Sequence, residues 1–344
     1  MKKQNIALAM SGGVDSTACG LLLKKHNVSG YFMNINQPDY QSQLERVREI
    51  AGQLKIPLTA IDLRQPFEKM VLNYFSAGYQ QALTPNPCFI CNQKIKFGLF
   101  FRAMQAAGAD RIATGHYARI DRLGSRCRLL KGADPRKDQS YFLAGLGQGQ
   151  LAKTIFPLGE MTKPEVYELV MAAGFTDFQG RESQDVCFLE AGKVGDFLER
   201  QGLITARPGQ IVSIGNEVLA EHQGLHHYTI GQRKGLGISD ATPYYVVALD
   251  AASNQVVVGK EPELFQASLT INRPHWLAGQ EPDLSKRYQV RIRHNHRGAE
   301  AELRLIEGGC LITFAEPQRA VTPGQFSVIY AGDEVIGSGE IRRP

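Results

Sequence analysis

The sequence predicts an α/β fold, in which a parallel sheet with helices on both faces is followed by a β-rich second part. Three observations lead to this prediction. Strand-like and helix-like segments alternate from residue 6 to about 114, which is the order of a parallel sheet. A mostly helical stretch follows from about 139 to 201, and short strands dominate after Arg207–Gly209. With 344 residues, the chain is also too long for one ordinary core.

Hydrophobic periodicity predicts each element in turn. The strands of the sheet are expected as short apolar runs at 6–9, 28–34, 58–62 and 111–114. The helices that alternate with them are expected at 17–23, 44–54, 66–78 and 95–107. Thr162 and Glu165 form a capping box that begins a further helix, and Gly174 ends it. The β-rich part has strand patterns at 210–214, 244–249, 255–258 and from 269 onward, and regular short strands indicate a small barrel or sandwich.

A glycine-rich turn joins the first strand to the first helix. It reads Ser11-Gly12-Gly13-Val14-Asp15-Ser16, and the backbone N–H groups at such a helix start can hold phosphate oxygens. It is not a Walker A loop, because the Gly-Lys-Ser/Thr ending is absent. Ligands of parallel sheets bind beyond the carboxyl ends of the strands, where this turn lies. The alternative is an ordinary tight turn of a doubly wound sheet.

Two of the six cysteines are separated by only two residues. This pair, Cys88 and Cys91, is typical of a redox pair or of half a metal site. Cys91 is expected near a helix N-terminus beside Lys94 and Lys96, a position that lowers a thiol pKa. Cys187 is the third candidate for chemistry. The remaining cysteines are surrounded by apolar residues or follow a glycine turn, and are expected in the core: Cys19, Cys127 and Cys310.

Composition and charge exclude some classes of protein. The chain is 43% hydrophobic and 21% charged, and it has no apolar run near the ~20 residues that span a bilayer. Its first residues lead into a strand rather than a signal sequence. We therefore expect a cytoplasmic protein with no membrane partner. The net charge of +5 is compatible with an RNA partner.

A strand near the C-terminus carries a basic face. Residues 288–293 alternate between apolar and polar side chains, so Gln289, Arg291 and Arg293 are expected to face solvent. A second basic loop, rich in glycine, lies at 231–235. Both features are typical of surfaces that bind nucleic-acid phosphates. The alternatives are a solvated strand face and a plain hairpin turn.

Taken together, these motifs resemble the tRNA-specific 2-thiouridylases, the MnmA/TrmU family of PP-loop ATP pyrophosphatases. The resemblance covers nearly the whole chain, in the family's order, and rests on Ser11–Ser16, Thr84–Pro87, Cys91–Asn92, Ile95–Phe97, Ala113–Arg119, Lys137–Leu143, Phe156–Gly159, Ser183–Gln184, Cys187–Phe188, Tyr228–Gly237 and Arg319–Gln325. It implies a PP-loop domain at 1–203 that includes a helical, tRNA-contacting part from about 139 to 203. It further implies a central β-rich domain at 204–264 and a tRNA-contacting C-terminal β-barrel at 265–344.

The resemblance implies a sulfurtransferase that uses ATP and Mg²⁺ to place sulfur on C2 of the wobble uridine of tRNA, releasing AMP and pyrophosphate. The family's nucleotide-binding residues correspond here to Ala9, Met10, Ser11, Gly12, Gly13, Val14, Asp15, Ser16, Met33 and Gly115. The residues beside the target base correspond to Asn86, Pro87 and Cys88. The other tRNA-binding residues correspond to Lys137, Asp138, Gln139, Arg293 and His294.

The resemblance leaves two routes for the sulfur. Cys91 matches the family's nucleophile and Cys187 its persulfide carrier, whose reaction ends in a Cys91–Cys187 disulfide. Cys88, however, stands where many members carry an aspartate, and Cys88, Cys91 and Cys187 resemble the three ligands of a 4Fe–4S cluster. Cluster ligands cannot carry a persulfide in the same turnover, so the routes are exclusive. The implied sulfur donor is a persulfide carrier protein or inorganic sulfide.

Two other functions fit parts of the sequence. A PP-loop ligase acting on a small molecule would use the turn at 11–16, but it has no need of Cys91 with Cys187 or of a basic barrel. A non-enzymatic RNA-binding or iron–sulfur protein would not need an intact nucleotide turn.

A second departure from the family, besides Cys88, is the short segment between Met33 and Gln41, where many members have a longer insert.

Overall fold

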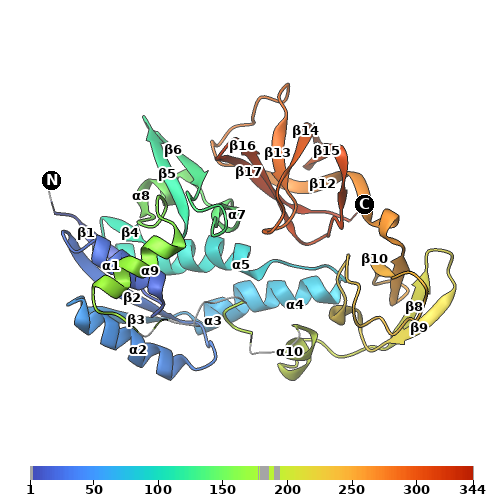
Figure 1. Ribbon diagram of the computed structural model, residues 1–344, viewed down its shortest axis with the longest axis horizontal. Coiled ribbons are helices and arrows are strands. Elements are labelled where there is room, and N and C mark those ends of the chain that lie inside the picture. Colours follow the sequence, from blue (N-terminus) through green and yellow to red (C-terminus); the bar gives the residue numbers. More distant parts are fainter. Residues whose placement is uncertain (1–2, 177, 179–185, 190–193, 344) are drawn as a thin grey trace.

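The computed structural model describes residues 3–176, 178, 186–189 and 194–343. Its N-terminal part is built on a parallel sheet. The strand order is β3-β2-β1-β4-β7 (Figure 1). The strands are β1 (Asn5–Ala9), β2 (Asn27–Asn34), β3 (Leu58–Asp62), β4 (Arg111–Ala113) and β7 (Thr154–Ile155). This confirms the predicted parallel sheet. The edge strand β7 lies in the stretch expected to be mostly helical, and with two residues it is too short to show alternation.

Helices cover both faces of the sheet, as predicted. Alternate residues of β1 point to opposite faces, so Ile6 and Leu8 belong to one buried cluster and Ala7 to another. The first cluster includes residues of α1 (Val14–Leu22), α2 (Tyr40–Gln53) and α9 (Lys163–Ala172). The second includes residues of α3 (Arg64–Phe67), α4 (Asn73–Gln80), α5 (Pro87–Ile90), α6 (Phe101–Ala106), α7 (Ser140–Leu143), α8 (Gln148–Lys153) and α10 (Val194–Arg200).

Two predicted helices contain π-helical stretches that the sequence did not indicate. They are η1 (Glu68–Leu72), between α3 and α4, and η2 (Cys91–Phe100), between α5 and α6. The second helix begins earlier than predicted, because Asn86 Oδ1 accepts the backbone N–H of Phe89 at 3.0 Å and so caps it. Pro87 then takes the first helical position. As a result, Cys88 and Cys91 both lie in the first turns of this helix.

The beginning and end of α9 agree with the sequence. Thr162 and Glu165 form the expected capping box, in which the backbone N–H of Thr162 donates to Glu165 Oε2 at 2.7 Å. The helix ends at Ala172, and Gly174 follows with a φ of +88°, a conformation that favours glycine.

Six strands at the C-terminus form a closed barrel, which confirms the expected small barrel. The order β12-β15-β14-β13-β16-β17 closes by pairing of β17 with β12. The strands are β12 (Phe265–Trp276), β13 (Tyr288–Arg291), β14 (Ala299–Ile306), β15 (Gly309–Arg319), β16 (Phe326–Ala331) and β17 (Glu334–Ile341). A hairpin of the N-terminal part, β5 (Ala118–Leu123) and β6 (Arg126–Lys131), adds to the outside of β17. The barrel is thereby attached to the rest of the molecule through a shared sheet.

A four-stranded sheet lies between these two parts in the sequence. Its strands are β8 (Gly209–Ser213), β9 (Val218–His222), β10 (Tyr245–Asp250) and β11 (Gln255–Gly259), in the order β10-β11-β8-β9. The short helices η3 (Leu225–His227) and η4 (Glu261–Leu264) flank β10 and β11 along the chain. Figure 1 shows this central sheet and the barrel on the side of the molecule away from the N-terminal sheet. Within the described residues, no helix is long and apolar enough to span a membrane.

Candidate active site

The predicted glycine turn is present at the carboxyl end of β1. Gly12 has a φ of +76°, and a Cβ atom at this position would lie 3.1 Å from Val47 Cγ2, so the turn requires glycine. The turn is closed by its own groups: the hydroxyl of Ser16 donates to Gly13 O at 3.0 Å and accepts the backbone N–H of Ser11 at 3.3 Å. No side chain of the described residues caps α1 at Gly13, which leaves its first N–H groups for an anion.

Asp15 of this turn is held by two residues that the sequence analysis did not select. Tyr117 Oη donates to Asp15 Oδ1 at 2.7 Å, and Lys163 Nζ lies 2.8 and 2.9 Å from the two carboxylate oxygens. Burial, with a contribution from Asp15, raises the pKa of Tyr117 well above its usual value. Lys163 neutralises a carboxylate that would otherwise repel phosphate. Both residues belong to motifs with other apparent roles, Lys163 to the capping box of α9 and Tyr117 to the segment after β4.

The other predicted nucleotide residues lie around the same edge of the sheet. Ala9 ends β1, and the next residue, Met10, donates its backbone N–H to Tyr31 O of β2 at 2.8 Å. Met33 lies near the carboxyl end of β2, opposite Ile61 of β3. Gly115 lies against the turn, because a Cβ atom there would be 3.0 Å from Cβ of Asp15. The topology therefore brings the predicted nucleotide residues, which come from three segments of the sequence, to one edge.

A second site lies at the start of the Pro87 helix, where three free cysteines line one small cavity. Cys88, Cys91 and Cys187 surround a space of about 30 Å³, together with Phe67, Pro87, Asn92, Lys96, Val186 and Phe188. Cys91 is buried, whereas Cys187 is exposed to solvent. Asn92 donates to Cys88 O at 3.0 Å, and its buried Oδ1 has no partner among the described residues.

The expectation that the pKa of Cys91 is lowered is wrong. Burial raises the pKa of Cys88 to about 11 and that of Cys91 to about 12, although Lys96 acts in the opposite direction on both. Burial disfavours the charged thiolate more than the single ammonium favours it. Burial of the thiol also raises the pKa of Cys187, although other parts of this residue are exposed. The thiols of the free protein are therefore held mainly in the protonated form at neutral pH.

The segment 114–117 connects the glycine turn with the cysteine cavity. Gly115 contacts Asp15, as described above, and the next residue, His116, packs edge-on against Phe156 and near Phe97 of η2. Thr114 Oγ1 lies 2.8 Å from His116 Nδ1. Burial, with a contribution from the Lys96 charge, holds the pKa of His116 well below its usual value. The imidazole of His116 is therefore neutral at pH 7.

Comparison with known proteins decides the family. The chain matches three family models, described as tRNA methyl transferase HUP domain over residues 4–191, tRNA methyl transferase PRC-barrel domain over 195–260 and Aminomethyltransferase beta-barrel domain over 266–341. It is 52% identical to the tRNA-specific 2-thiouridylase MnmA of Desulfotalea psychrophila, over 99% of this chain and 100% of that protein. The chain belongs to the tRNA-specific 2-thiouridylase family.

Another 2-thiouridylase and one solved structure extend the comparison. The tRNA-specific 2-thiouridylase MnmA of Syntrophomonas wolfei is 41% identical, over 98% of this chain and 99% of that protein. A structure described as a predicted subunit of tRNA methyltransferase, from Methanocaldococcus jannaschii, is 17% identical and covers 49% of this chain and 74% of that one. Its TM-score of 0.33 is too low to carry an argument. The 2-thiouridylase similarity therefore rests on the curated relatives.

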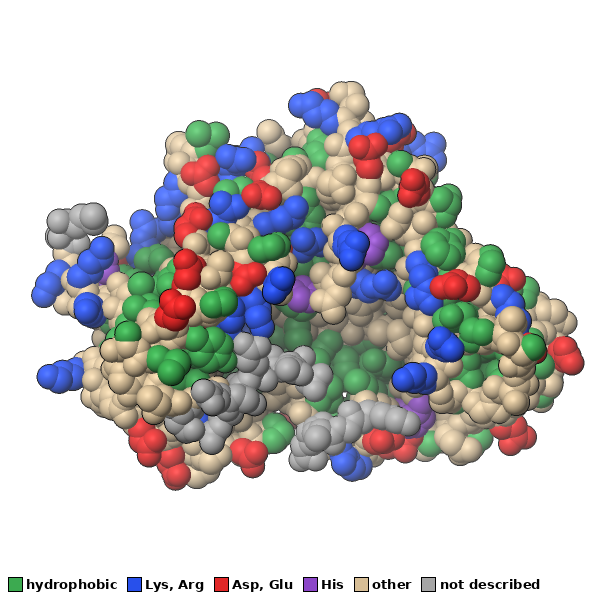
Figure 2. All heavy atoms as spheres, in the orientation of Figure 1, with side chains coloured by type: hydrophobic (Ala, Val, Ile, Leu, Met, Phe, Trp, Pro, Cys, Tyr) green, Lys and Arg blue, Asp and Glu red, His purple; other side chains and the backbone are tan. Residues whose placement is uncertain are grey.

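In this 2-thiouridylase, the two segments that were predicted to contact tRNA lie side by side. His294 Nε2 is 3.2 Å from Asp138 O, and its ring stacks on Phe142 at 4.4 Å between centroids. Gln139 Oε1 accepts the backbone N–H of Tyr117 at 3.1 Å. Arg293 is exposed. Figure 2 shows this face hollowed below the barrel, with Lys and Arg side chains around the hollow.

Two side chains near these segments differ from the expectation. Asp138 is buried, and its carboxylate accepts the backbone N–H groups of Gly132 and Ser140 at 3.1 and 3.0 Å. Arg291, expected to face solvent, instead lies 2.8 Å from Asp138 Oδ2. The strand alternation placed Arg291 correctly outside the barrel core. It did not predict that the N-terminal part covers this face.

Proposed function

We propose that this protein replaces the C2 oxygen of the wobble uridine of tRNA with sulfur, converting ATP to AMP and pyrophosphate. The observation that carries this proposal is the short connection between the two sites. Gly115 contacts Asp15 of the glycine turn, and the next residue, His116, packs near Phe97 of η2, the π-helical stretch that begins at Cys91 and contains Lys96 of the cysteine cavity. A group activated by ATP and a sulfur nucleophile can therefore meet at one base.

The turn at 11–16 suits ATP because it offers backbone N–H groups and a glycine that leaves room for phosphate. The uracil C2 carbonyl is a poor electrophile, and its oxygen is a poor leaving group. Transfer of AMP to that oxygen with release of pyrophosphate makes it a good leaving group. Mg²⁺ carried with ATP neutralises phosphate charge. Lys163 neutralises Asp15 beside the turn, which keeps the phosphate site free of repulsion.

In the persulfide route, Cys187 receives sulfur from a persulfide carrier protein, because it is the most exposed residue of the three. The terminal sulfur attacks C2, and AMP leaves with the oxygen. The Cys91 thiolate then attacks Cys187 Sγ, which releases the 2-thiouridine and forms a Cys91–Cys187 disulfide. A dithiol reductant reopens that disulfide. Lys96 favours the thiolate that this step requires.

The three thiols also suit the second route, although the cavity of about 30 Å³ would have to open to hold a cluster. Three thiols lining one space are the donor set of a 4Fe–4S cluster with one open iron, and Cys88 has no role in the persulfide route. Cys88, Cys91 and Cys187 would hold the cluster, and its chemistry would be to bind inorganic sulfide as the donor. The two routes stay exclusive within one turnover, and the iron measurement described in the Discussion separates them.

The tRNA contacts and domain limits are part of the proposal. Asn86, Pro87 and Cys88 would lie beside the target base, and Lys137, Asp138, Gln139, Arg293 and His294 would contact tRNA. For Asp138 the burial of its carboxylate supports a contact through the backbone only. The proposed domains are 1–203, 204–264 and 265–344. The limits of the matched family models support the second boundary, at 260 to 266, whereas they put the first at 191 to 195, before the proposed residue 203.

The family models are named after methyl transfer, whereas the curated relatives are named after thiolation. A phosphate-binding turn beside convergent cysteines favours thiolation, because methyl transfer requires neither group.

The test of the proposed function is incubation of the protein with unmodified tRNA, ATP, Mg²⁺ and a sulfur donor under anaerobic conditions. We expect AMP formation that depends on tRNA, and a wobble uridine whose mass shows sulfur in place of oxygen. AMP formation stimulated by a small molecule and indifferent to tRNA would favour the ligase alternative.

A further inference from the structure

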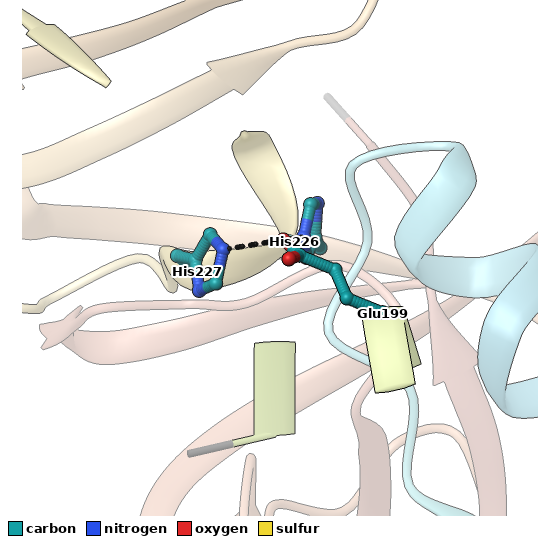
Figure 3. A group of neighbouring side chains, drawn as sticks. All are labelled: Glu199, His226 and His227. Atoms are coloured by element: carbon teal, nitrogen blue, oxygen red, sulfur yellow. Dashed lines mark hydrogen bonds and ion pairs between the residues drawn. The ribbon is translucent and has the colours of Figure 1, made fainter. Parts of the chain in front are cut away.

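Away from the cysteine cavity, two histidines and a glutamate meet where α10 packs against η3 of the central part (Figure 3). Glu199 Oε1 lies 2.7 Å from His226 Nε2 and 2.9 Å from His227 Nε2. The potential ligand atoms of the three side chains all lie within 4.8 Å of one another. His226 is buried, whereas Glu199 and His227 keep some contact with solvent. Nothing in the proposed thiolation uses these residues.

We propose that Glu199, His226 and His227 bind a divalent transition metal ion, with zinc as the ion that best matches the donor set. Two imidazole nitrogens and one carboxylate oxygen are ligands that zinc prefers, and three protein ligands leave a fourth position for water. The ion would replace the protons that now join each Nε2 to Glu199. Ligands of a tetrahedral zinc lie roughly 3.3 Å apart, so Glu199 Oε1, now 2.7 and 2.9 Å from the two Nε2 atoms, would move about half an ångström farther from each.

The backbone around the pair makes room for both imidazole rings. A Cβ atom at Gly195 would lie 2.2 Å from Nδ1 of His227, and one at Gly224 would lie 2.4 Å from Cε1 of His226. Any other residue at either position would push a ring away from Glu199. The convergence of the rings therefore depends on glycine in both elements, α10 and the turn before η3.

A further carboxylate, that of Asp196, lies near His227 and outside the three proposed ligands. Asp196 Oδ1 lies 3.8 Å from His227 Nδ1. This distance is too long for a hydrogen bond in the metal-free structure, and a hydrogen bond formed there when the ion binds would orient the ring, as second-shell carboxylates do in zinc sites. Asp196 and Glu199 are three residues apart on α10, so both lie on the face that meets η3.

Metal binding here would connect two parts of the chain. Glu199 belongs to α10, which follows the segment 186–189 that carries Cys187, whereas His226 and His227 belong to the central part. A bound ion would fix α10 against η3. The effect on stability is independent of ATP, tRNA and sulfur, so a failure of the thiolation proposal leaves this one intact, and the reverse is also true.

The experiment is a titration of the full-length protein with zinc and with cobalt, in competition with a chromophoric chelator. We expect the wild-type protein to bind about one more ion than His227→Gln or Glu199→Gln. Cobalt at this site should give visible d–d bands without the near-ultraviolet charge-transfer bands that cobalt on Cys88, Cys91 or Cys187 would give. His26→Gln, at a histidine far from α10 in the sequence, is the matched control and should bind like the wild type.

A milder variant keeps the test valid if the others fold poorly. Asp196→Asn retains all three ligands, so the ion count should be unchanged while affinity falls about 10- to 100-fold. Zinc should also raise the melting temperature of the wild type more than that of the variants. Equal ion counts in the wild type and both ligand variants, or cobalt spectra with only thiolate charge-transfer bands, would overturn the proposal.

Discussion

The guanidinium of Arg291, on the barrel, lies 2.8 Å from the carboxylate of Asp138, in the N-terminal part of the chain. The Asp138 side chain is 2% exposed and that of Arg291 15% exposed, so the pair is largely shielded from water. Arg291 also lies over the ring of Tyr330, 5.0 Å from its centroid. This ion pair holds the barrel beside segment 137–139, next to the proposed tRNA contacts.

Loss of the Arg291 charge should destabilise the protein strongly. Arg291→Met leaves the buried carboxylate of Asp138 without its partner, which costs about 3 kcal/mol in free energy of unfolding. Urea unfolding followed by circular dichroism measures the change. Arg287→Met is the matched control, because Arg287 pairs with Glu300 and Glu302 on the exposed face of the same barrel and should show no measurable loss. Equal midpoints for both variants would contradict a stabilising role for Arg291.

Removal of the Lys163 charge should weaken ATP binding. Lys163→Gln leaves the Asp15 carboxylate uncompensated beside the phosphate turn, and a lost charged hydrogen bond corresponds to a factor of about ten or more in affinity. Tyr117→Phe removes one hydrogen bond to the same carboxylate but no charge, so its effect should be smaller. Equilibrium binding of ATP by calorimetry checks both. If Lys163→Gln binds ATP like the wild type, Asp15 does not face the phosphates.

Thiol reactivity should rise only at alkaline pH. Because burial raises the pKa of Cys88 to about 11 and of Cys91 to about 12, the fraction of thiolate at pH 7 is small and grows toward those values. Lys96→Met removes the charge that favours thiolate, so alkylation of Cys91 at a given pH should be slower. Rates for each cysteine are measured by mass spectrometry after reaction with iodoacetamide.

The matched control for that measurement is Lys94→Met. Lys94 is exposed and does not line the cavity, so this change should leave the rate at Cys91 unaltered. An apparent pKa near 8 for Cys91 in the wild-type protein, or equal rates in the two variants, would show that the cavity does not protect the thiol as its burial indicates.

Iron content separates the two sulfur routes. The cluster route predicts about four irons per chain after anaerobic purification, with matching acid-labile sulfide. Cys88→Ala removes one of three ligands and should lose the iron, whereas Cys127→Ala, which alters a cysteine outside the cavity, should keep it. An iron-free wild-type protein that thiolates tRNA from a persulfide donor would reject the cluster and assign the transferred sulfur to Cys187.

Arg293 should contribute to tRNA binding through phosphate. Arg293→Ala is expected to weaken binding and to reduce the slope of log affinity against log salt by about 0.9 for one lost contact, somewhat less for single-stranded RNA. ATP affinity serves as the internal control and should be unchanged. The measurement is a filter-binding titration over a range of salt concentrations. An unchanged slope would place Arg293 outside the phosphate contacts.

Local patterns predicted the elements because short-range physics decides them. The alternation of strands and helices, the turn at 11–16, the capping box at Thr162 and the end of α9 before Gly174 all follow from periodicity, caps and permitted φ values. The core positions of Cys19, Cys127 and Cys310 follow from their apolar neighbours. The family resemblance, which rests on motif order, was also available from the sequence.

Contacts between distant segments were not predictable in this way. Lys163 reaches Asp15 across 148 positions in the sequence, and Arg291 reaches Asp138 across 153. The prediction of a lowered pKa for Cys91 is wrong for the same reason. The closeness of Lys96 along the helix can be seen in the sequence, whereas burial by Phe67 and Phe188 cannot. Desolvation depends on every atom that surrounds a group, and those atoms come from the whole chain.

The sequence by itself therefore determined the order of elements, the phosphate turn, the cysteine candidates and the family. The tertiary structure alone decided which charges are paired, which thiols are buried and which surfaces meet. The physical reason is one of range: backbone conformation depends on a few neighbouring residues, whereas burial and ion pairing depend on how the sheet, the central part and the barrel pack together.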